Sequence, residues 1–277
     1  MKMTYFILTA LLVSLGSVLL AQETHQGPTT KLIQYRKSTS LFNGQNLKGW
    51  YTFVQKRGKN IDPKNVFTVV DQQIRISGEE WGCITTKKQF ENYRLALEFR
   101  WGGKTEGNRI DKARDSGLLL HSNGADGGSS GIWMHSIECQ IIEGGTGDIL
   151  VVGDGSNKFS ITASVAKEKQ AGSYRYQEGG LPAVLNKGRL NWYGRDDNWQ
   201  DVIGFKGKQD IEKPMGEWNQ LECIANGNEI IVYLNGVLVN RAREVLPSKG
   251  QIQIQSEGAE IYVRNIQLTK QKKSRKN

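Results

Sequence analysis

The chain has 277 residues, of which 38% are hydrophobic and 23% charged, with 32 glycines and five prolines. This composition excludes a collagen-like or disordered chain and indicates a globular, turn-rich one. The formal net charge of +9 is weak evidence for a nucleic-acid partner, because five of these charges come from the tail after residue 269 and one from Lys2, which leaves three for the body.

The N-terminus carries Lys2, an almost uncharged apolar run from Tyr5 to Leu20, and then the small residue Ala21. The chain turns polar at Gln22, so the run is typical of a cleaved secretory signal peptide over residues 1–21, with a retained anchor as the alternative. We therefore expect an exported protein, periplasmic or extracellular, without stable membrane insertion after cleavage. No cysteine follows the run, which leaves a lipid anchor without an attachment point.

Domain organisation is simple. Residues 22–40 lack periodicity and are predicted to be a linker, residues 41–269 a single domain, and residues 270–277 a basic tail. The three cysteines, Cys83, Cys139 and Cys223, allow at most one intramolecular disulfide and lack the spacing of metal ligands. We interpret Cys139 and Cys223 as buried free thiols because both lie in apolar, strand-like runs.

Alternation of apolar and polar residues predicts β-strands over most of the domain. In Tyr93–Trp101 every odd position is apolar, so one face of this strand should pack and the other should be polar. The pair Asn235-Gly236 between two apolar runs predicts a β-hairpin, since both central residues of a type I′ turn need positive φ.

Eight further strands are predicted, and helical periodicity is confined to residues 163–170. The predicted strands are Phe67–Val70, Ile74–Ser77, Gly117–His121, Ile137–Ile142, Arg189–Tyr193, Asn219–Ala225, Gln251–Gln255 and Ile261–Leu268. This pattern predicts an all-β fold, an antiparallel two-sheet β-sandwich.

The candidate site lies on polar strand faces that point away from the core. Glu138 and Gln140 alternate with apolar residues that should face the core, and three glutamines alternate with two isoleucines in Gln251–Gln255. The amides of Gln253 and Gln255 suit sugar hydroxyls, although an ordinary solvated strand face is the alternative for this row.

Residues 115–143 hold two of the three histidines and several carboxylates on strands joined by a Gly/Ser-rich loop. His135 can be a general base, a metal ligand or a structural histidine, and its parity matches the core face. Retaining β-glucanases carry Glu-x-Asp-x-x-Glu on their active strand, whereas here Gln140 stands at the position of the Asp between Glu138 and Glu143. The two glutamates also need a bulge to share a face.

Seven tryptophans are present, and most are expected in the core. Trp133, Trp192 and Trp199 lie in Gly-rich and polar surroundings, where an aromatic ring can stack on the C–H face of a pyranose. Stacking and core packing both remain open for these three residues.

Several segments in order resemble one family. They are Leu41–Trp50, Tyr93–Arg100, Asp115–Leu118, Ile137–Ile141, Gly216–Asn219, Tyr233–Val237, Gly250–Gln255 and Val263–Leu268. Together they resemble the 3-keto-disaccharide hydrolase family, also described as 3-keto-glucoside lyases and 3-keto-2-hydroxyglucal hydratases. The resemblance spans residues 41–268 and implies a concanavalin A-like jelly roll and an exported enzyme acting on oligosaccharides or glycosides. One departure is that family members often carry His where this chain has Ser256-Glu257-Gly258 after Gln255.

The resemblance implies cleavage through a 3-keto sugar. A carbonyl at C3 acidifies the C2 proton, so a base can remove it and the enolate can expel the C1 substituent. Glu138 or His135 is the expected base, with Glu143 as a further catalytic candidate. The expected substrate contacts come from Arg94, Arg100, Gln140, Gln253, Gln255, Trp133 and Trp192.

Three alternatives stay open at this stage. A divalent metal held by His135, Glu138 and Glu143 can polarise the C3 carbonyl in place of the arginines. A non-catalytic carbohydrate-binding module and a retaining β-glucanase-like hydrolase are the other functions that the sequence allows.

Overall fold

The computed structural model describes residues 35–271, which form two stacked β-sheets and one short 3-10 helix, η1 (Gly107–Arg109). The predicted signal peptide and most of the predicted linker and basic tail lie outside the described residues. Within residues 22–40, Thr39 and Ser40 pair with Leu268 and Gln267, so strand pairing begins just upstream of residue 41. No helix among residues 35–271 is long and apolar enough to cross a membrane.

The first sheet contains ten strands. In spatial order they are β13 (Leu181–Leu185), β11 (Ser160–Val165), β17 (Val237–Leu246), β16 (Glu229–Leu234), β15 (Asn219–Asn226), β7 (Tyr93–Thr105), β19 (Ala259–Lys270), β5 (Gln73–Ile76) and β4 (Phe67–Val70), with β1 (Thr39–Ser40) also paired to β19.

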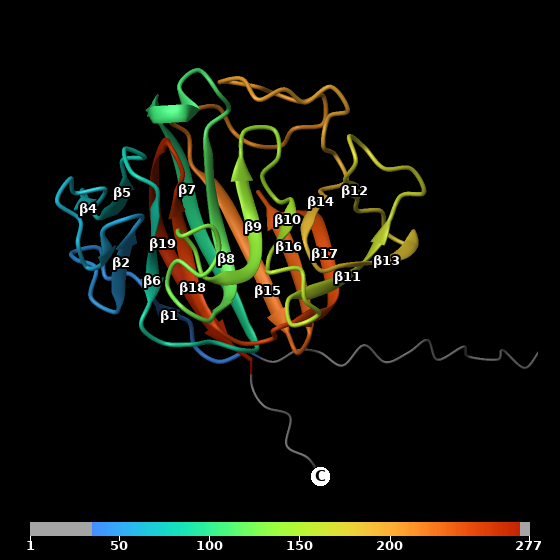
Figure 1. Cartoon of the computed structure of the whole chain (residues 1–277), viewed down its shortest axis with the longest axis horizontal. Helices are drawn as coiled ribbons and strands as arrows, with labels where there is room; N and C mark the ends of the chain where they lie inside the picture. Colours follow the sequence, from blue (N-terminus) through green and yellow to red (C-terminus); the bar gives the residue numbers. More distant parts are fainter. Residues whose placement is uncertain (1–34, 272–277) are drawn as a thin grey trace, which may run out of the picture. The chain divides into compact units, whose positions relative to one another are not determined.

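The second sheet contains nine strands and carries the candidate site. In spatial order they are β12 (Tyr174–Arg175), β14 (Gly188–Asn191), β10 (Ile149–Val152), β9 (His135–Ile142), β8 (Asp115–Asn123), β18 (Gln251–Ser256), β6 (Gly82–Thr86), β2 (Trp50–Val54) and β3 (Gly58–Lys59). All its pairings are antiparallel except the short one between β12 and β14. Figure 1 shows β8 and β9 side by side in the middle of this sheet.

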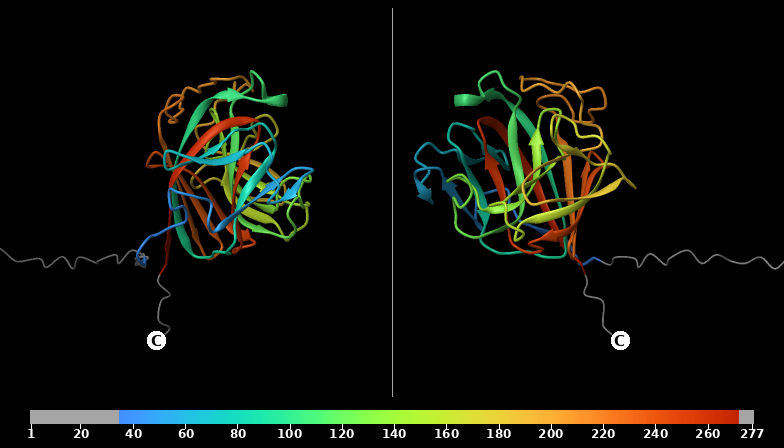
Figure 2. Two further views of the ribbon diagram at one scale, coloured as in Figure 1. Left: turned by 90° about the vertical axis from the view of Figure 1, so that its left-hand side faces the viewer. Right: turned by 45° about the vertical axis from the view of Figure 1, so that its right-hand side comes forward.

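The main hydrophobic core lies between the sheets. Tyr93, Leu95, Leu97, Phe99 and Trp101 of β7 all enter it, while the intervening positions 94, 96, 98 and 100 are half-buried on the opposite face. Ile137, Cys139 and Ile141 of β9 enter the same core from the second sheet. The alternation in both strands therefore confirms the antiparallel two-sheet sandwich of jelly-roll type, whose two layers are seen edge-on in Figure 2.

Local signals account for several elements. The predicted hairpin is formed by β16 and β17, and Asn235 and Gly236 have φ values of 50° and 82°, as a type I′ turn requires. The prediction of helical periodicity at residues 163–170 was wrong, because β11 covers the first of these residues and pairs with both β13 and β17. Besides β11, the strands β1, β2, β3, β6, β10, β12 and β13 were not predicted, since they are short and lack a strict alternation.

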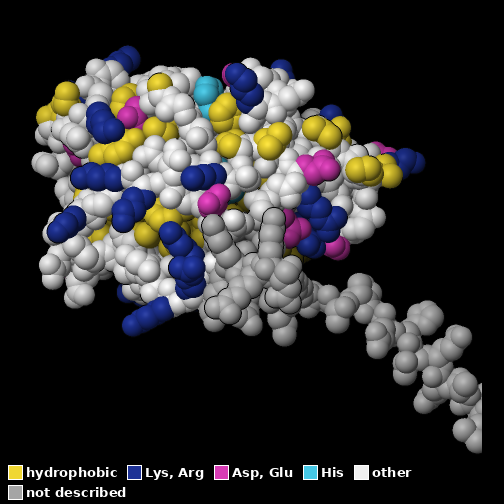
Figure 3. All heavy atoms as spheres, turned by 90° about the horizontal axis from the view of Figure 1, so that it is seen from below, with side chains coloured by type: hydrophobic (Ala, Val, Ile, Leu, Met, Phe, Trp, Pro, Cys, Tyr) yellow, Lys and Arg dark blue, Asp and Glu magenta, His cyan; other side chains and the backbone are white. Residues whose placement is uncertain are grey.

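The cysteines agree with the sequence interpretation. Cys83, Cys139 and Cys223 are buried free thiols. Figure 3 shows Lys and Arg side chains spread over the viewed face among apolar and uncharged groups, rather than gathered into one stripe.

Candidate active site

The register of five neighbouring strands brings polar residues together on the outer face of the nine-stranded sheet. Leu119 of β8 is the Cα partner of both Gln253 and Glu138, and Leu150 of β10 is the partner of both Glu138 and Arg189. Glu138 and Arg189 therefore lie two strands apart in one cross-strand row, which corresponds to roughly 10 Å between their backbones. Because Ile137 and Cys139 enter the main core, Glu138 points to the opposite, outer face.

Gly117 allows two of these side chains to converge. A Cβ atom at this position would lie 2.2 Å from Gln255 Oε1 and 2.3 Å from Glu138 Oε1. Gln255 Oε1 is buried without a hydrogen-bond partner among the described residues, so it is an acceptor for a protonated Glu138 or for a ligand hydroxyl. A larger residue than glycine would separate the carboxyl and the amide.

Three acidic side chains form the centre of the site, and we call Asp115, Glu138 and Glu257 the carboxyl cluster. Burial raises the pKa of Glu138 to about 8; the nearby Asp115 carboxylate adds to this shift, and the Arg189 guanidinium opposes it. Burial likewise raises the pKa of Asp115 to about 7 against the opposing charge of Arg109.

Glu257 shares the electrostatic environment of the other two acids. Loss of hydration raises its pKa well above the ordinary glutamate value, and the charges of Asp115 and Glu138 raise it further. Three carboxyls that disfavour one another's ionisation titrate as a unit, so the cluster retains at least one proton near neutral pH. Such a cluster can both accept and donate a proton.

Asp115 is held in place by two donors. Gln140 Nε2 donates to Asp115 Oδ1 at 2.5 Å, and Arg109 Nη2 lies 3.6 Å from Asp115 Oδ2. Arg109 in turn pairs with Asp201 at 2.7 Å, which ties the short helix η1 to the loop after residue 195. Gln140 therefore positions an acid of the cluster, in addition to facing the site itself.

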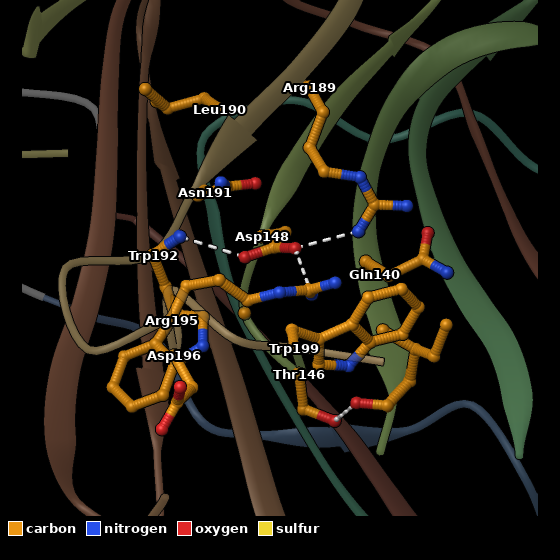
Figure 4. Close-up of polar contacts among 12 residues, drawn as sticks. Gln140, Thr146, Asp148, Arg189, Leu190, Asn191, Trp192, Arg195, Asp196 and Trp199 are labelled. Carbon is orange, nitrogen blue, oxygen red and sulfur yellow. Dashed lines mark hydrogen bonds and ion pairs between the residues drawn. The ribbon is translucent and has the colours of Figure 1, made fainter. Parts of the chain in front are cut away.

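A buried aspartate orients the cationic side of the site. Asp148 is fully buried and accepts hydrogen bonds from Arg189 Nη1 at 2.7 Å, Arg195 Nη1 at 2.6 Å and the backbone N–H of Trp192 at 2.8 Å. Figure 4 shows both guanidinium groups converging on this carboxylate, with Arg189 alongside Gln140. One aspartate serves two arginines, so positive charge remains available next to the carboxyl cluster.

The opposite flank of Glu138 is apolar. On the outer face Cys83, Leu119, Ile132 and Trp133 form a second hydrophobic cluster, and Trp81 packs against it. The rings of Trp81 and Trp133 are stacked with centroids 6.0 Å apart. These residues exclude water from one side of the site, which is the physical origin of the raised pKa of Glu138.

Of the residues predicted for the site, the structure brings Glu138, Gln140 and Gln255 together. Glu143 lies beyond the end of β9, where its carboxylate accepts from Arg114 Nη1 at 2.5 Å and from the backbone N–H groups of Arg114 and Gly204, both at 2.9 Å. Its hydrogen bonds among the described residues all go to Arg114 and Gly204, away from the carboxyl cluster, and its catalytic role stays a prediction. No bulge brings Glu143 onto the face of Glu138.

His135 also lies outside the cluster. It begins β9 with the core parity of Ile137, and its ring lies 5.0 Å from that of Phe159, which borders the main core. His135 and Glu143 are at opposite ends of the strand, roughly 25 Å apart. The predicted metal set of His135, Glu138 and Glu143 is therefore not assembled, and no group of three or more His, Cys, Asp or Glu side chains within residues 35–271 is arranged to hold a metal ion.

The two predicted arginines lie on the other sheet. Arg94 of β7 pairs with Glu222, and Arg100 stacks over the ring of Tyr262 at 4.2 Å. Both point away from the core on the far side of the sandwich, so they cannot reach Glu138. The cations near the carboxyl cluster are instead Arg189, which acts on Glu138, and Arg109, which acts on Asp115 and Glu257.

Three further predicted contacts have structural roles. Gln253 Nε2 donates to Thr85 Oγ1 at 2.9 Å, and its Oε1 accepts from the backbone N–H of Met134, so it fastens the 124–134 loop. Trp133 is buried in the outer-face apolar cluster and Trp192 is buried in the main core. Both rings are buried, whereas Trp81 is half-buried.

Sequence reasoning missed most of the charged partners. Asp115 and Glu257 were visible in the motifs without an assigned role. Arg109, Asp148 and Arg189 gave no signal, because they come from a short helix, a loop and the short strand β14, which only the tertiary fold brings together.

Comparison with known proteins gives a family match. The model of the 3-keto-alpha-glucoside-1,2-lyase-like domain matches residues 37–269. No curated protein matches the chain significantly. The family match supports a carbohydrate-active function.

Solved structures with similar folds were also found. A Parabacteroides distasonis ATCC 8503 protein provisionally assigned as a glycosyl hydrolase is 20% identical over 85% of this chain and 100% of its own, with a TM-score of 0.48. The carbohydrate-binding module CBM66 from Bacillus subtilis is 13% identical over 79% and 93%, with a TM-score of 0.39. The β-glucanase of Bacillus licheniformis is 10% identical over 87% and 99%, with a TM-score of 0.41. None of these likenesses is close enough to assign a substrate.

Proposed function

The chain belongs to the 3-keto-alpha-glucoside-1,2-lyase-like domain family, and from that premise we propose that it cleaves the glycosidic bond of 3-keto-glycosides by removing the C2 proton. The observation that carries this proposal is Glu138, which is only 4% exposed, converges with Gln255 over Gly117, and has a pKa raised to about 8. A carboxylate whose pKa lies near the working pH is suited to proton abstraction.

The proposed first step is an elimination. The C3 carbonyl acidifies the C2–H bond, and the ionised Glu138 takes this proton. The electron pair of the C2–H bond delocalises onto the C3 oxygen as an enolate, which Arg189 stabilises from across Leu150. The enolate then re-forms the carbonyl and the C2=C1 double bond forms as the C1–O bond breaks.

The leaving oxygen needs a proton, and the carboxyl cluster supplies it. Glu257 is suited to hold this proton, since burial raises its pKa and the charges of Asp115 and Glu138 raise it further. It donates this proton to the departing alkoxide, and addition of water across the new double bond completes a net hydrolysis. Asp115, fixed by Gln140 and Arg109, sets the charge of the cluster during both transfers.

Direct hydrolysis by a retaining pair of carboxylates is less well supported. That reading requires Glu138 and Glu143 to flank one bond about 5 Å apart, yet the Glu143 carboxylate is engaged by Arg114 and by two backbone donors. A non-catalytic sugar-binding role is the remaining alternative. A binding role does not explain why three carboxyls with raised pKa values lie together.

The proposal is tested by aglycone release from both anomers of methyl 3-keto-glucoside, with the unoxidised glucosides as controls. We expect release only from the keto sugars, and Glu138→Gln should abolish turnover while sparing binding. Cleavage of the unoxidised glucosides would indicate a retaining hydrolase, and binding of the keto sugars without release would indicate a binding module.

We also propose that the protein is exported. The support is the charged start, the apolar run to Leu20 and the small residue Ala21. Fractionation of cells that express the full chain, with mass spectrometry of the N-terminus, tests it. We expect a protein outside the cytoplasm that begins at Gln22.

A further inference from the structure

A cavity lies at the end of the sandwich where β12 and β14 face β17. It has a volume of about 660 Å³, with Tyr193, Tyr176 and Leu238 among its apolar walls and Arg175, Arg241 and Glu178 among its polar ones. None of these residues belongs to the carboxyl cluster or contacts it in any hydrogen bond or ion pair of the described chain. Cavities of this size commonly hold small ligands.

The ring of Tyr193 is exposed and held in a fixed orientation. The residue is 39% exposed, and its ring meets the fully buried Trp192 edge-on, with centroids 5.2 Å apart and an interplanar angle of 75°. The backbone N–H of Tyr193 also reaches Val239 O of β17 at 3.4 Å. An exposed aromatic ring that packs edge-on against a buried neighbour is a ready platform for the C–H face of a sugar ring.

The floor of the cavity is apolar and its polar groups are oriented by partners. Leu238 packs against the main core, and Tyr176 is buried with its hydroxyl donating to Glu178. Arg241 Nη2 pairs with Glu229 at 2.7 Å and its Nη1 lies 3.9 Å from Glu178. Donors and acceptors that are already fixed around an apolar floor favour a ligand with hydroxyl groups around an apolar ring.

The charges around this cavity cancel one another. Arg175 pairs with Asp197, while Arg241 and Arg243 both contact Glu229. Each charged side chain that lines the cavity is therefore paired with an opposite charge, so the cavity offers no unpaired charge to select an ionic ligand. An uncharged ligand is therefore favoured over a phosphate, a sulfate or a sugar acid.

We propose that this cavity is a second carbohydrate-binding site, which takes a pyranose unit of a neutral oligosaccharide against Tyr193. It binds sugar without cleaving it, because it lacks a carboxyl with the environment of Glu138. The site does not depend on the 3-keto chemistry proposed for the carboxyl cluster, so either proposal can fail while the other stands.

The test is calorimetric titration of the protein with four neutral hexasaccharides, the β-1,4-linked oligomers of glucose, mannose and xylose and the α-1,4-linked oligomer of glucose. At least one should bind, and Tyr193→Ala should weaken that binding about tenfold, the order expected for loss of one aromatic stack. Tyr193→Phe should retain binding because it keeps the ring. Val184→Ala is the matched control, since Val184 is 70% exposed on the edge strand β13 and does not line the cavity.

Two results would overturn the proposal. One is that none of the four oligosaccharides binds the wild-type protein. The other is that binding survives Tyr193→Ala unchanged, which would place all sugar binding outside this cavity. Thermal unfolding of Tyr193→Ala at the wild-type temperature would show that the variant is folded.

Discussion

Glu138 lies directly over Gly117, so close that a Cβ atom at residue 117 would stand 2.3 Å from its Oε1. The same Cβ atom would meet Gln255 Oε1 at 2.2 Å. The absence of a side chain on β8 therefore allows the base proposed here and its amide neighbour to occupy one place on the sheet.

Gly117→Ala should displace Glu138 and reduce turnover of a 3-keto-glucoside by about 100-fold, the scale of a misplacement near 1 Å. The matched control is Gly103→Ala on β7, where a new Cβ meets nothing within 4 Å. Steady-state kinetics on folded variants measures the effect. Equal activity of the two variants would contradict the arrangement.

The pH dependence of kcat/KM should follow the carboxyl cluster. The base works in its ionised form and the pKa of Glu138 is raised to about 8, so kcat/KM should rise as the pH increases toward that value. Arg189 opposes the shift, and Arg189→Gln should therefore move this rise to higher pH. Arg94→Gln, on the other sheet, should leave the profile unchanged, and a shift in both variants would argue against a local effect.

Stability should show the opposite dependence on pH. The folded-state pKa of Glu138 lies above its ordinary value, so the folded state binds this proton more tightly than the unfolded chain does. The contribution of this proton to the free energy of unfolding is therefore fully present below the ordinary glutamate pKa. It is lost as the pH rises toward and through 8. Glu138→Gln removes this loss, so its melting temperature relative to the wild type should be higher at pH 8 than at pH 5. A difference that does not vary with pH would contradict the raised pKa.

Substitutions of Glu143 and of Glu138 should have different effects, the first on stability and the second on turnover. Removal of the buried Glu143 leaves Arg114 without its partner, so Glu143→Ala should cost roughly 3–5 kcal/mol in the free energy of unfolding. Its turnover per folded molecule should remain near wild type, measured below the melting temperature. Glu138→Gln should instead keep the fold and lose turnover, and the reverse pattern would restore Glu143 as the catalytic residue.

The faces of the strands could be predicted from the sequence, because side chains in a strand alternate with a period of two. This rule placed Glu138 and Gln140 outward and Ile137 and Cys139 inward, as found in β9. It could not reveal which of the two outer faces of the sandwich a strand belongs to. Arg94 and Arg100 alternate as Glu138 does, yet they lie on the other sheet.

The partners of the site depend on contacts across long distances in the sequence. Asp148 in a turn, Arg189 on β14 and Arg195 in the following loop meet only because β10 lies between β9 and β14. The burial of Trp133 depends in the same way on the 124–134 loop, which Gln253 fastens over the sheet. Neither feature leaves a periodic or compositional trace in the sequence.

The central claim is that Glu138 removes the C2 proton of a 3-keto-glycoside. The most direct test is the rate of aglycone release from methyl 3-keto-glucoside carrying deuterium at C2, compared with the unlabelled sugar under single-turnover conditions. We predict a primary isotope effect, with no release by Glu138→Gln. Equal rates for the two sugars together with full activity of Glu138→Gln would contradict the account.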